Sequence, residues 1–560
     1  DVVLGVDFDE AALKTFKENH GKAEAMKLDL FDHSNIDEII NFLEEKNIKL
    51  QDKKKVSIIE KIGKKIPDPV IIFAIFYVVV LFSTLFLGGK TFEVMSGDGS
   101  YTTHTIENMF KAENIQWIFS NALLNNWLAY GGGVLGTILV VMLGVGLAEE
   151  SGLLSTLIKK VGLKVSDKML PIVLVFLGIM SSIATDAGYV ILIPLAGLLY
   201  AGLKKNPIIG MAAAFAGVSA GFSANLIPAT PIDIIIGNNA KIFAEGQGVP
   251  FVSAAGKTLN PATMHYYFVV ASTFMLATIG AFVTIKVIKP RLEKESYTIT
   301  EDMNLNDFTV KPIENKALKF SGLGFIIAAA CVIGLYFGPL KTFVNAETGA
   351  KVTPFMDNII LIITFLFFLP GVFYGFKVGK FKSANDVVKG MSKQMGSMGS
   401  VLVLTFFSYN FLALLTKSGL GTYITYLGGN LLKAMNLSEF PILLIIGFII
   451  ITAIINLFVG GLTSKWMLLG PIFVPMLYQV NSNMTPEVVA AAYRVADSST
   501  NIITPLMSYA GIILVYMRKY KPEYTVGDMI RLMMPYSISF LIGWTILLLG
   551  FFAFGIPFGF

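Results

Sequence analysis

The sequence predicts an all-α polytopic membrane protein that begins with a short α/β fragment. Three observations predict this fold class: 54% of the 560 residues are hydrophobic while only 15% are charged, apolar runs recur at bilayer-spanning length, and charged residues are dense only in the first 50 positions. An ordinary soluble domain carries roughly 25% charged residues. The main body of the chain is therefore an integral membrane protein.

Residues 1–50 form the α/β fragment. They contain 12 acidic and 6 basic residues, and VVLGVDFD, EAALKTFKENH, AMKLDLFD and IDEIINFLEEKNIK predict strand, helix, strand and helix. This stretch resembles the cofactor-binding half of DNA cytosine-5 methyltransferases. That family's glycine-rich loop and Pro-Cys nucleophile are missing, because the single cysteine, Cys331, lies in an apolar run. We expect a truncated remnant or fusion scar without activity.

Nine full spans and two re-entrant hairpins are expected after residue 50. Windows of about 20 apolar residues cross a hydrocarbon core of about 30 Å. Two apolar stretches, 169–202 and 441–479, exceed one span and contain Gly-rich polar breaks, so we interpret each as a hairpin whose tip lies at membrane depth. The nine spans are expected near 70–89, 127–148, 207–236, 265–288, 319–340, 358–375, 395–416, 487–516 and 532–556.

Lysine and arginine orient these spans. Basic segments such as KKKVSIIEKIGKK, IKKVGLKVSDK, KVIKPRLEKE and MRKYKPEY fall on one side of the expected topology, which places them in the cytoplasm and the carboxyl end outside. The net charge of +5 thus indicates topology and not a nucleic-acid partner. We expect a multi-pass protein of the inner (cytoplasmic) membrane, embedded in the lipid bilayer.

An internal repeat divides the membrane part into residues 51–300 and 319–560, joined by a cytoplasmic linker at 301–318. EESGLLSTLI matches TKSGLGTYI, the hairpin tip SSIATDAGYVILIP matches GLTSKWMLLGPIFVP, and SANLIP matches STNIITP, at offsets of about 267, 281 and 276 residues. The loops of the two copies differ in lysine content, which favours opposite orientations. Inverted repeats with broken helices are typical of secondary transporters, whose ligands bind where the repeats meet.

Each half offers neutral oxygen ligands at its hairpin tip and at its broken helix, GFSANLIPATPID or DSSTNIITP. Such oxygens suit a weakly bound monovalent cation such as sodium. The alternative is that small polar residues only allow close helix packing. No cofactor is expected beyond sodium or a proton as the coupling ion. The candidate ion-binding residues are Ser182, Asp186, Ser223, Asn225, Thr463, Ser499 and Asn501.

Ionisable residues inside apolar spans cost about 3 kcal/mol each on insertion, so they are functional candidates. Besides Asp186, they are Asp233, Lys465, Arg494 and Asp497. Arg494 and Asp497 are three residues apart on one helix, so they can neutralise each other, which leaves open a purely structural pair. Beside Trp466, however, the Arg494 fork suits an aromatic carboxylate ligand.

Five segments carry a family resemblance: GVGLAEESGLLSTLIKK, TDAGYVILIPL, AGFSANLIPATPID, TSKWMLLGPIFVPM and YRVADSSTNIITPL. Over residues 52–560 the chain resembles the AbgT family of p-aminobenzoyl-glutamate transporters. The resemblance implies a homodimer that moves p-aminobenzoyl-glutamate or sulfonamide-type antimetabolites using a sodium or proton gradient. Its first break departs from the family pattern at Pro231. The implied substrate-binding residues are Asp233, Trp466, Pro486, Arg494, Asp497 and Pro505.

Other functions are separated by sequence features. A sodium-dicarboxylate symporter of similar architecture remains open, as does a channel, although repeated hairpins favour alternating access. A DNA methyltransferase is disfavoured because residues 1–50 lack that family's motifs. A primary pump is disfavoured because the sequence contains no G-x-x-x-x-G-K-[ST] phosphate loop. We therefore expect a transporter and not an enzyme.

Overall fold

The chain forms two compact units, Asp1–Lys61 and Ile62–Phe560, in a computed structural model. The structure describes residues 4–7, 24–27, 67–95, 101–129, 134–162, 166, 168–183, 188–298, 309–345, 351–396, 398–504 and 509–560. In the first unit, the strands β1 (Leu4–Asp7) and β2 (Glu24–Lys27) overlap the two predicted strands and pair in parallel. The two helices expected in residues 1–50 lie outside the described residues.

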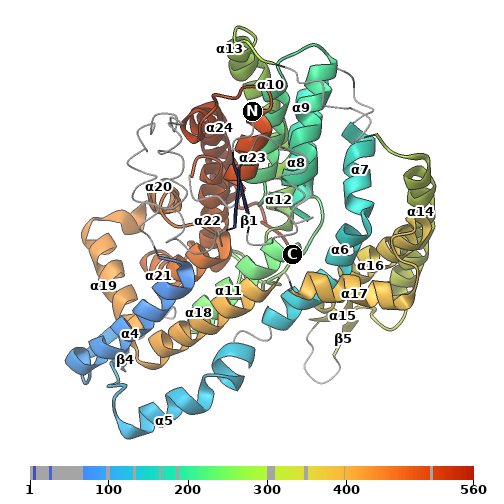
Figure 1. Cartoon of the computed structure of the whole chain (residues 1–560). Coiled ribbons are helices and arrows are strands. Elements are labelled where there is room, and N and C mark those ends of the chain that lie inside the picture. The colour runs from blue at the N-terminus through green and yellow to red at the C-terminus, as the bar shows by residue number, and fades with distance from the viewer. Residues whose placement is uncertain are drawn as a thin grey trace. The chain divides into compact units, whose positions relative to one another are not determined.

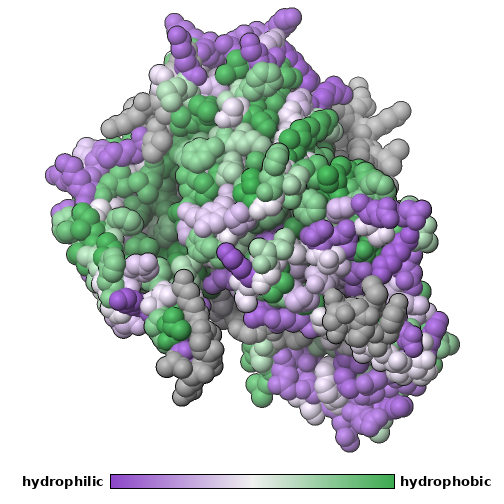
Figure 2. Space-filling view, turned by 180° about the vertical axis from the view of Figure 1, so that it is seen from behind, coloured by the Kyte–Doolittle hydropathy of each residue, from purple (hydrophilic) through white to green (hydrophobic). Residues whose placement is uncertain are grey.

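Six of the described helices are long and apolar enough to cross a membrane, and a seventh span results if α6 and α7 are counted as one bent element. Their apolar side chains stay exposed, as lipid-facing residues do, and Figure 2 shows hydrophobic residues across the middle of one face. The six are α4 (Pro69–Leu87), α12 with its extension (Tyr266–Leu292), α14 (Pro312–Phe337), α16 (Ile359–Val378), α18 (Gly399–Lys417) and α24 (Val526–Ala553). Each coincides with an expected span.

The other three expected spans are interrupted helices, so the total of nine stays a prediction. The first contains α6 (Val134–Ser151), which bends by 59° into α7 (Leu153–Gly162). The second breaks between the π-helical turn η4 (Ala216–Ala220) and α11 (Pro231–Glu245), after α10 (Pro207–Phe215). The third consists of α22 (Pro486–Asn501) and α23 (Ala510–Arg518).

Both expected hairpins consist of two helices separated by a break. The first contains α8 (Leu170–Met180), the short turns η2 (Ser181–Ile183) and η3 (Gly188–Leu192), and α9 (Ile193–Gly202). The second contains α20 (Pro441–Asn456) and α21 (Leu462–Val480). Their re-entrant course through a membrane stays a prediction.

The first pair of repeated motifs forms the same turn in both halves. Gly152 and Gly419 both have a positive φ, +89° and +73°, which favours glycine. The preceding hydroxyls also match, since Ser151 Oγ donates to the carbonyl of Ala148 and Ser418 Oγ to that of Leu415. Corresponding residues of the two copies therefore adopt corresponding geometry, and the inversion of the repeats stays a prediction.

Helices of the second unit pack in two regions (Figure 1). α6, α14, α16 and α17 (Ala384–Gly396) pack on one another around small apolar clusters, one of which contains Ala148, Ala317 and Tyr374. The larger apolar core is shared by the helices from α8 to α12 and from α20 to α24. This larger core surrounds the two breaks.

Several short elements were not predicted from the sequence. The antiparallel strands β3 (Thr91–Met95) and β4 (Tyr101–Thr105) are anchored by Phe92, whose ring lies 5.1 Å from that of Tyr423. Polar alternation in this segment is too short to distinguish a hairpin from a loop. The other unpredicted elements are α5 (Ala112–Asn121), β5 (Phe343–Val344), β6 (Lys351–Val352), α15 (Pro354–Asp357), α19 (Leu420–Ala434) and η7 (Leu437–Glu439). The turn η1 (Leu124–Ala129) overlaps the start of the span expected at 127–148, and η5 (Thr284–Ile288) and α13 (Lys289–Leu292) are the extension of α12.

Candidate functional site

The breaks of the two halves lie against each other. After η4 the chain runs without helix up to α11, so backbone groups become free for other partners. The N–H of Ser223 donates to Ser498 Oγ over 3.1 Å, and the amide of Asn501 donates to Ser219 Oγ over 3.2 Å. Two polar motifs that are 275 residues apart in sequence therefore form one polar centre.

Asp233 is fixed at the start of α11 by a capping box. The backbone N–H and the hydroxyl of Thr230 donate to Asp233 Oδ2 at 2.9 and 2.6 Å. Pro231 is the first residue of the helix, a position where its missing N–H needs no partner, so it leaves Asp233 in place. The other carboxylate oxygen, Oδ1, lies 2.6 Å from Arg494 Nη2.

The Arg494 guanidinium is held from three sides. Besides Asp233, its Nη2 donates to the carbonyl of Ser223 over 2.7 Å, and its Nη1 lies 3.2 Å from His265 Nδ1. His265 Nε2 lies 2.8 Å from the carbonyl oxygen of Glu487 and must carry the proton there, so Nδ1 is the acceptor for Arg494. No spacing or motif in the sequence identifies this histidine as part of the site.

Asp497 pairs with Lys465. It does not pair with Arg494, which the helical spacing would permit. Lys465 Nζ lies 2.6 Å from Asp497 Oδ1 and also donates to Asn456 Oδ1. The i, i+3 spacing only permits a pair on one helix, whereas here each charge finds a closer partner on another helix. The pair within one helix, which the spacing had left open, is therefore not formed, and two ion pairs between helices take its place.

Trp466 follows Lys465 on α21 and is fully buried. Its Nε1 donates to the carbonyl of Ile236 over 3.1 Å, and its ring centroid lies 4.7 Å from that of Tyr493, the residue before Arg494. Phe243 contacts the indole edge at 5.6 Å. The structure thus brings Asp233, Trp466, Arg494 and Asp497 into one buried centre.

The candidate ion ligands of the first half also meet. Asn225 Nδ2 donates to Ser182 Oγ over 2.8 Å, which connects the first hairpin to the first break. The hydroxyl of Ser223 is buried without a hydrogen-bond partner among the described residues. An unpartnered buried oxygen is costly, so this group is available to a ligand.

The remaining candidates are less central. Ser499 Oγ is buried and has no partner in the described part of the chain, and Thr463 is half-buried in the first turn of α21. Pro486 is the first residue of α22, two turns before Arg494. Asp186 and Pro505 lie outside the described residues.

Comparison with known proteins decides the family. Residues 54–560 match the model of the "AbgT putative transporter family". The chain belongs to the AbgT family. It is 28% identical over 505 residues to the p-aminobenzoyl-glutamate transport protein of Escherichia coli K12, with 90% of this chain and 95% of that protein covered.

Two solved structures resemble this AbgT family member. The YdaH transporter of Alcanivorax borkumensis matches with a TM-score of 0.78 and 34% identity over 88% of this chain and all of that one. Its crystal structure is described as revealing an unusual topology. MtrF of Neisseria gonorrhoeae, described as illuminating a class of antimetabolite efflux pumps, matches with a TM-score of 0.76 and 34% identity over 88% and 96%. The chain is therefore a multi-pass membrane transporter and not an enzyme.

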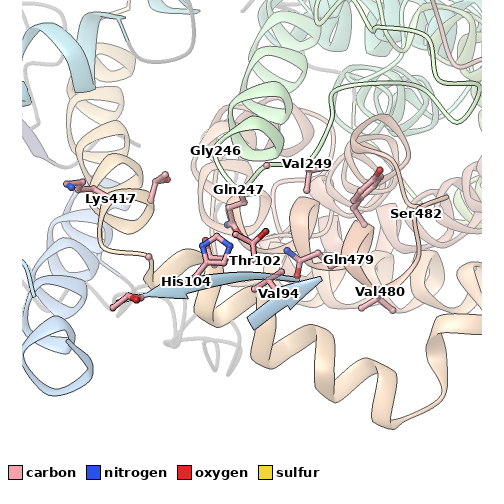
Figure 3. A pocket seen from close by; sticks show the side chains of 16 residues that line it. Val94, Thr102, His104, Gly246, Gln247, Val249, Lys417, Gln479, Val480 and Ser482 are labelled. Atoms are coloured by element: carbon pink, nitrogen blue, oxygen red, sulfur yellow. The ribbon is translucent and has the colours of Figure 1, made fainter. Parts of the chain in front are cut away.

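Three cavities in the described part of this AbgT transporter are lined by none of the charged residues of the buried centre. One of about 690 Å³ is lined by β4, the end of α11 and the end of α21, whose side chains face it in Figure 3. Another, of about 990 Å³, includes Glu487 and Val488 at the start of α22. The third, of about 850 Å³, reaches Gly461 and Ser464 at the second hairpin break. Arg494 is only 2% exposed, so this conformation is closed around its charges.

The charges of the centre cancel. Asp233 and Asp497 balance Arg494 and Lys465, and no group of three metal-ligating side chains occurs among the described residues. Arg494 Nε has no partner among the described residues, and Nη2 becomes available to an anionic ligand if Asp233 is displaced or neutralised. The centre can therefore exchange one carboxylate for another on a single guanidinium.

Proposed function

We propose that this protein is an ion-coupled secondary transporter that moves p-aminobenzoyl-glutamate, or related aromatic and sulfonamide-type antimetabolites, across the cytoplasmic membrane by alternating access. The observation that carries the proposal is the buried Arg494–Asp233 pair at the meeting point of the two halves. In secondary transporters the substrate binds at this point of the fold. The described relatives supply the substrate class.

The geometry supports a carboxylate ligand. Arg494 presents a planar fork that can hold a carboxylate through two parallel hydrogen bonds. Asp233 supplies such an oxygen in the closed state, so a ligand carboxylate takes its position on Arg494. The nearby Trp466 ring suits the aminobenzoyl ring of the ligand.

Coupling uses the first half. Ser182, Ser223 and Asn225 place neutral oxygens at the first hairpin and break, which favours sodium. A proton on Asp233 is the other way to free Arg494, and it makes proton coupling the competing mechanism. We further propose that the transporter works as a homodimer, as its resemblance to the family implies.

The test is counterflow in proteoliposomes loaded with p-aminobenzoyl-glutamate, with external labelled substrate and independent variation of sodium and pH. We expect labelled substrate to accumulate transiently and unlabelled sulfonamide to compete. Accumulation of labelled succinate in its place would identify a dicarboxylate symporter. Equal uptake in empty and loaded vesicles would contradict carrier-type exchange.

A further inference from the structure

Lys465 lies in a buried polar site of the second half. Three helices meet here: α20 supplies Asn456, α21 supplies Lys465 and α22 supplies Asp497. Both charged side chains are only 1% exposed. The Nζ atom contacts a carboxylate oxygen and an amide oxygen, which are also the ligands that a monovalent cation uses.

The amide of Asn456 is preset for this task. Its Nδ2 donates to the carbonyl of Asp497 and to Thr500 Oγ1, each over 2.7 Å. Both donor hydrogens are therefore used on α22, and Oδ1 is left to face Lys465. Thr452, one turn earlier on α20, adds a buried hydroxyl with no partner among the described residues. These hydrogen bonds of Asn456 hold its side-chain oxygen in place independently of Lys465.

The first half carries no charge at the corresponding positions. With the repeat offsets of 281 and 276 residues, Lys465 corresponds to Ala184 and Asp497 to Gly221. At the first break, Asn225 Nδ2 donates to Ser182 Oγ, Asn225 Oδ1 accepts from the N–H of Ile227, and Ser223 Oγ has no partner among the described residues. Among the described residues, the first break therefore offers neutral oxygens beside Arg494, whose Nη2 contacts the carbonyl of Ser223, whereas the second half already holds the ammonium group of Lys465 against Asp497. Asp186 of the first hairpin tip lies outside the described residues.

We propose that the Lys465 ammonium is a built-in cation, which occupies in the second half the position that a coupling ion takes in the first half. A single free cation, and not two, then binds per transport cycle. Lys465 acts as a positioning residue: it keeps Asp497 neutralised while Arg494, three residues away, exchanges partners. This inference rests on the proposed ion-coupled transport, but the test below measures cation binding without any substrate.

The experiment removes the tethered cation and offers a free one. Lys465→Ala deletes a chain that propylammonium closely replaces. Purified Lys465→Ala protein should be less heat-stable than wild type in N-methylglucamine chloride, and propylammonium or sodium should restore its melting temperature saturably. Wild type should show no such response to propylammonium. Lys465→Gln, whose amide still donates to Asn456, should respond in the same direction.

Matched controls make the response specific. The double variant Lys465→Ala/Asp497→Ala should lose the response, because the carboxylate is gone, and Arg494→Ala should not respond to propylammonium. In vesicles that transport, the sodium dependence of Lys465→Ala should become steeper, with a Hill coefficient moving from about 1 toward about 2.

Melting temperatures of Lys465→Ala that ignore both cations would overturn the proposal. A double variant that still responds, or failure of both lysine variants to fold in every salt, would do the same. Absence of wild-type counterflow contradicts the proposed function instead and leaves the melting result to be judged separately.

Discussion

Ion pairs around the two breaks differ from those at the ends of α6 and α17. Arg494–Asp233 and Lys465–Asp497 have 2.6 Å separations, and their side chains are 1–7% exposed. Glu150, at the end of α6, instead receives Lys393 at 2.9 Å and Lys380 at 3.3 Å, with lysine exposures of 70% and 48%. The distances are similar, so burial and not proximity distinguishes the two groups.

This difference separates a site from a surface. Buried charges stabilise little in net terms, because desolvation offsets their attraction, and a buried charge that loses its partner is strongly unfavourable. Exposed pairs contribute up to about 1 kcal/mol and weaken with salt. Stability alone is therefore a weak reason to keep the two buried pairs beside the broken helices, and exchange of partners with a ligand is the role that we propose for them.

The largest expected effect comes from breaking one buried pair. Arg494→Ala should destabilise the protein by about 3–5 kcal/mol, because Asp233 is left charged and unpaired. Asp233→Asn is the matched partner variant, since the amide oxygen can still accept from Thr230 and keep the start of α11. The double variant should regain thermal stability but not p-aminobenzoyl-glutamate binding, measured on purified protein. Recovery of both properties would reduce the pair to a structural role.

Retaining the charge of Arg494 should not retain binding. Arg494→Lys supplies one ammonium in place of the two-donor fork, so affinity should fall about tenfold or more, equivalent to about 1.4 kcal/mol. Thermal stability should fall less than in Arg494→Ala. Wild-type affinity in the lysine variant would show that the ligand does not contact the fork.

Trp466 tests whether an aromatic face serves the ligand. Trp466→Ala opens a cavity beside Tyr493 and should cost about 3–5 kcal/mol of stability as well as binding. Trp466→Phe loses the hydrogen bond to Ile236, about 1 kcal/mol, and part of the ring volume, but it keeps an aromatic face and should keep most affinity. Binding measured at matched folded fraction separates the two effects. Equal affinity in both variants removes Trp466 from the site.

Asn225 and Asn501 compare the two halves directly. Asn225→Ala should raise the sodium concentration for half-maximal transport several-fold, because this amide donates to Ser182 in the candidate ion site of the first half. Asn501→Ala should change it less, since Asn501 contacts Ser219 and lies in the half that holds Lys465. Transport by both variants with unchanged sodium dependence would contradict the ion-site assignment.

The sequence predicted where the helices break but not which charges meet. Composition and run length are local properties, so the six long apolar helices and both breaks were accessible. Pairing of Arg494 with Asp233 joins residues of different halves, and spacing on one helix indicated Asp497 instead. Likewise His265 carries no motif, and its contact with Arg494 depends on how α12 and α22 pack. Partner choice among buried charges is decided by tertiary structure.

Breaking the ion pairs of Glu150 with Lys380 and Lys393 should cost much less stability than breaking a buried pair. Glu150→Gln should change the free energy of unfolding by about 1 kcal/mol or less, and the difference should shrink in high salt. Lys393→Ala is the control that removes one of the two partners. Thermal unfolding at low and high ionic strength measures both. A loss as large as that of Arg494→Ala would abolish the distinction drawn between the two regions.

Asp386 carries the smallest expected effect, and it depends on pH. Asp386 Oδ2 accepts from the backbone N–H of Lys382 and of Ser383, at 2.9 and 3.0 Å, at the start of α17. These hydrogen bonds, led by that from Lys382, hold the pKa of Asp386 below its usual value.

A carboxyl whose pKa is lowered on folding stabilises the folded state above its unfolded pKa, about 3.9, and loses that contribution as the pH falls through its lower folded value. Amide exchange in the first turn of α17, corrected for intrinsic rates, should therefore accelerate below about pH 4 in wild type. Asp386→Asn should show faster exchange at neutral pH and little further change on acidification. The buried centre should stay protected in both proteins, because the hydrogen bonds of Asp386 are confined to the start of α17. An acid-sensitive first turn in Asp386→Asn equal to that of wild type would assign the effect to another carboxylate.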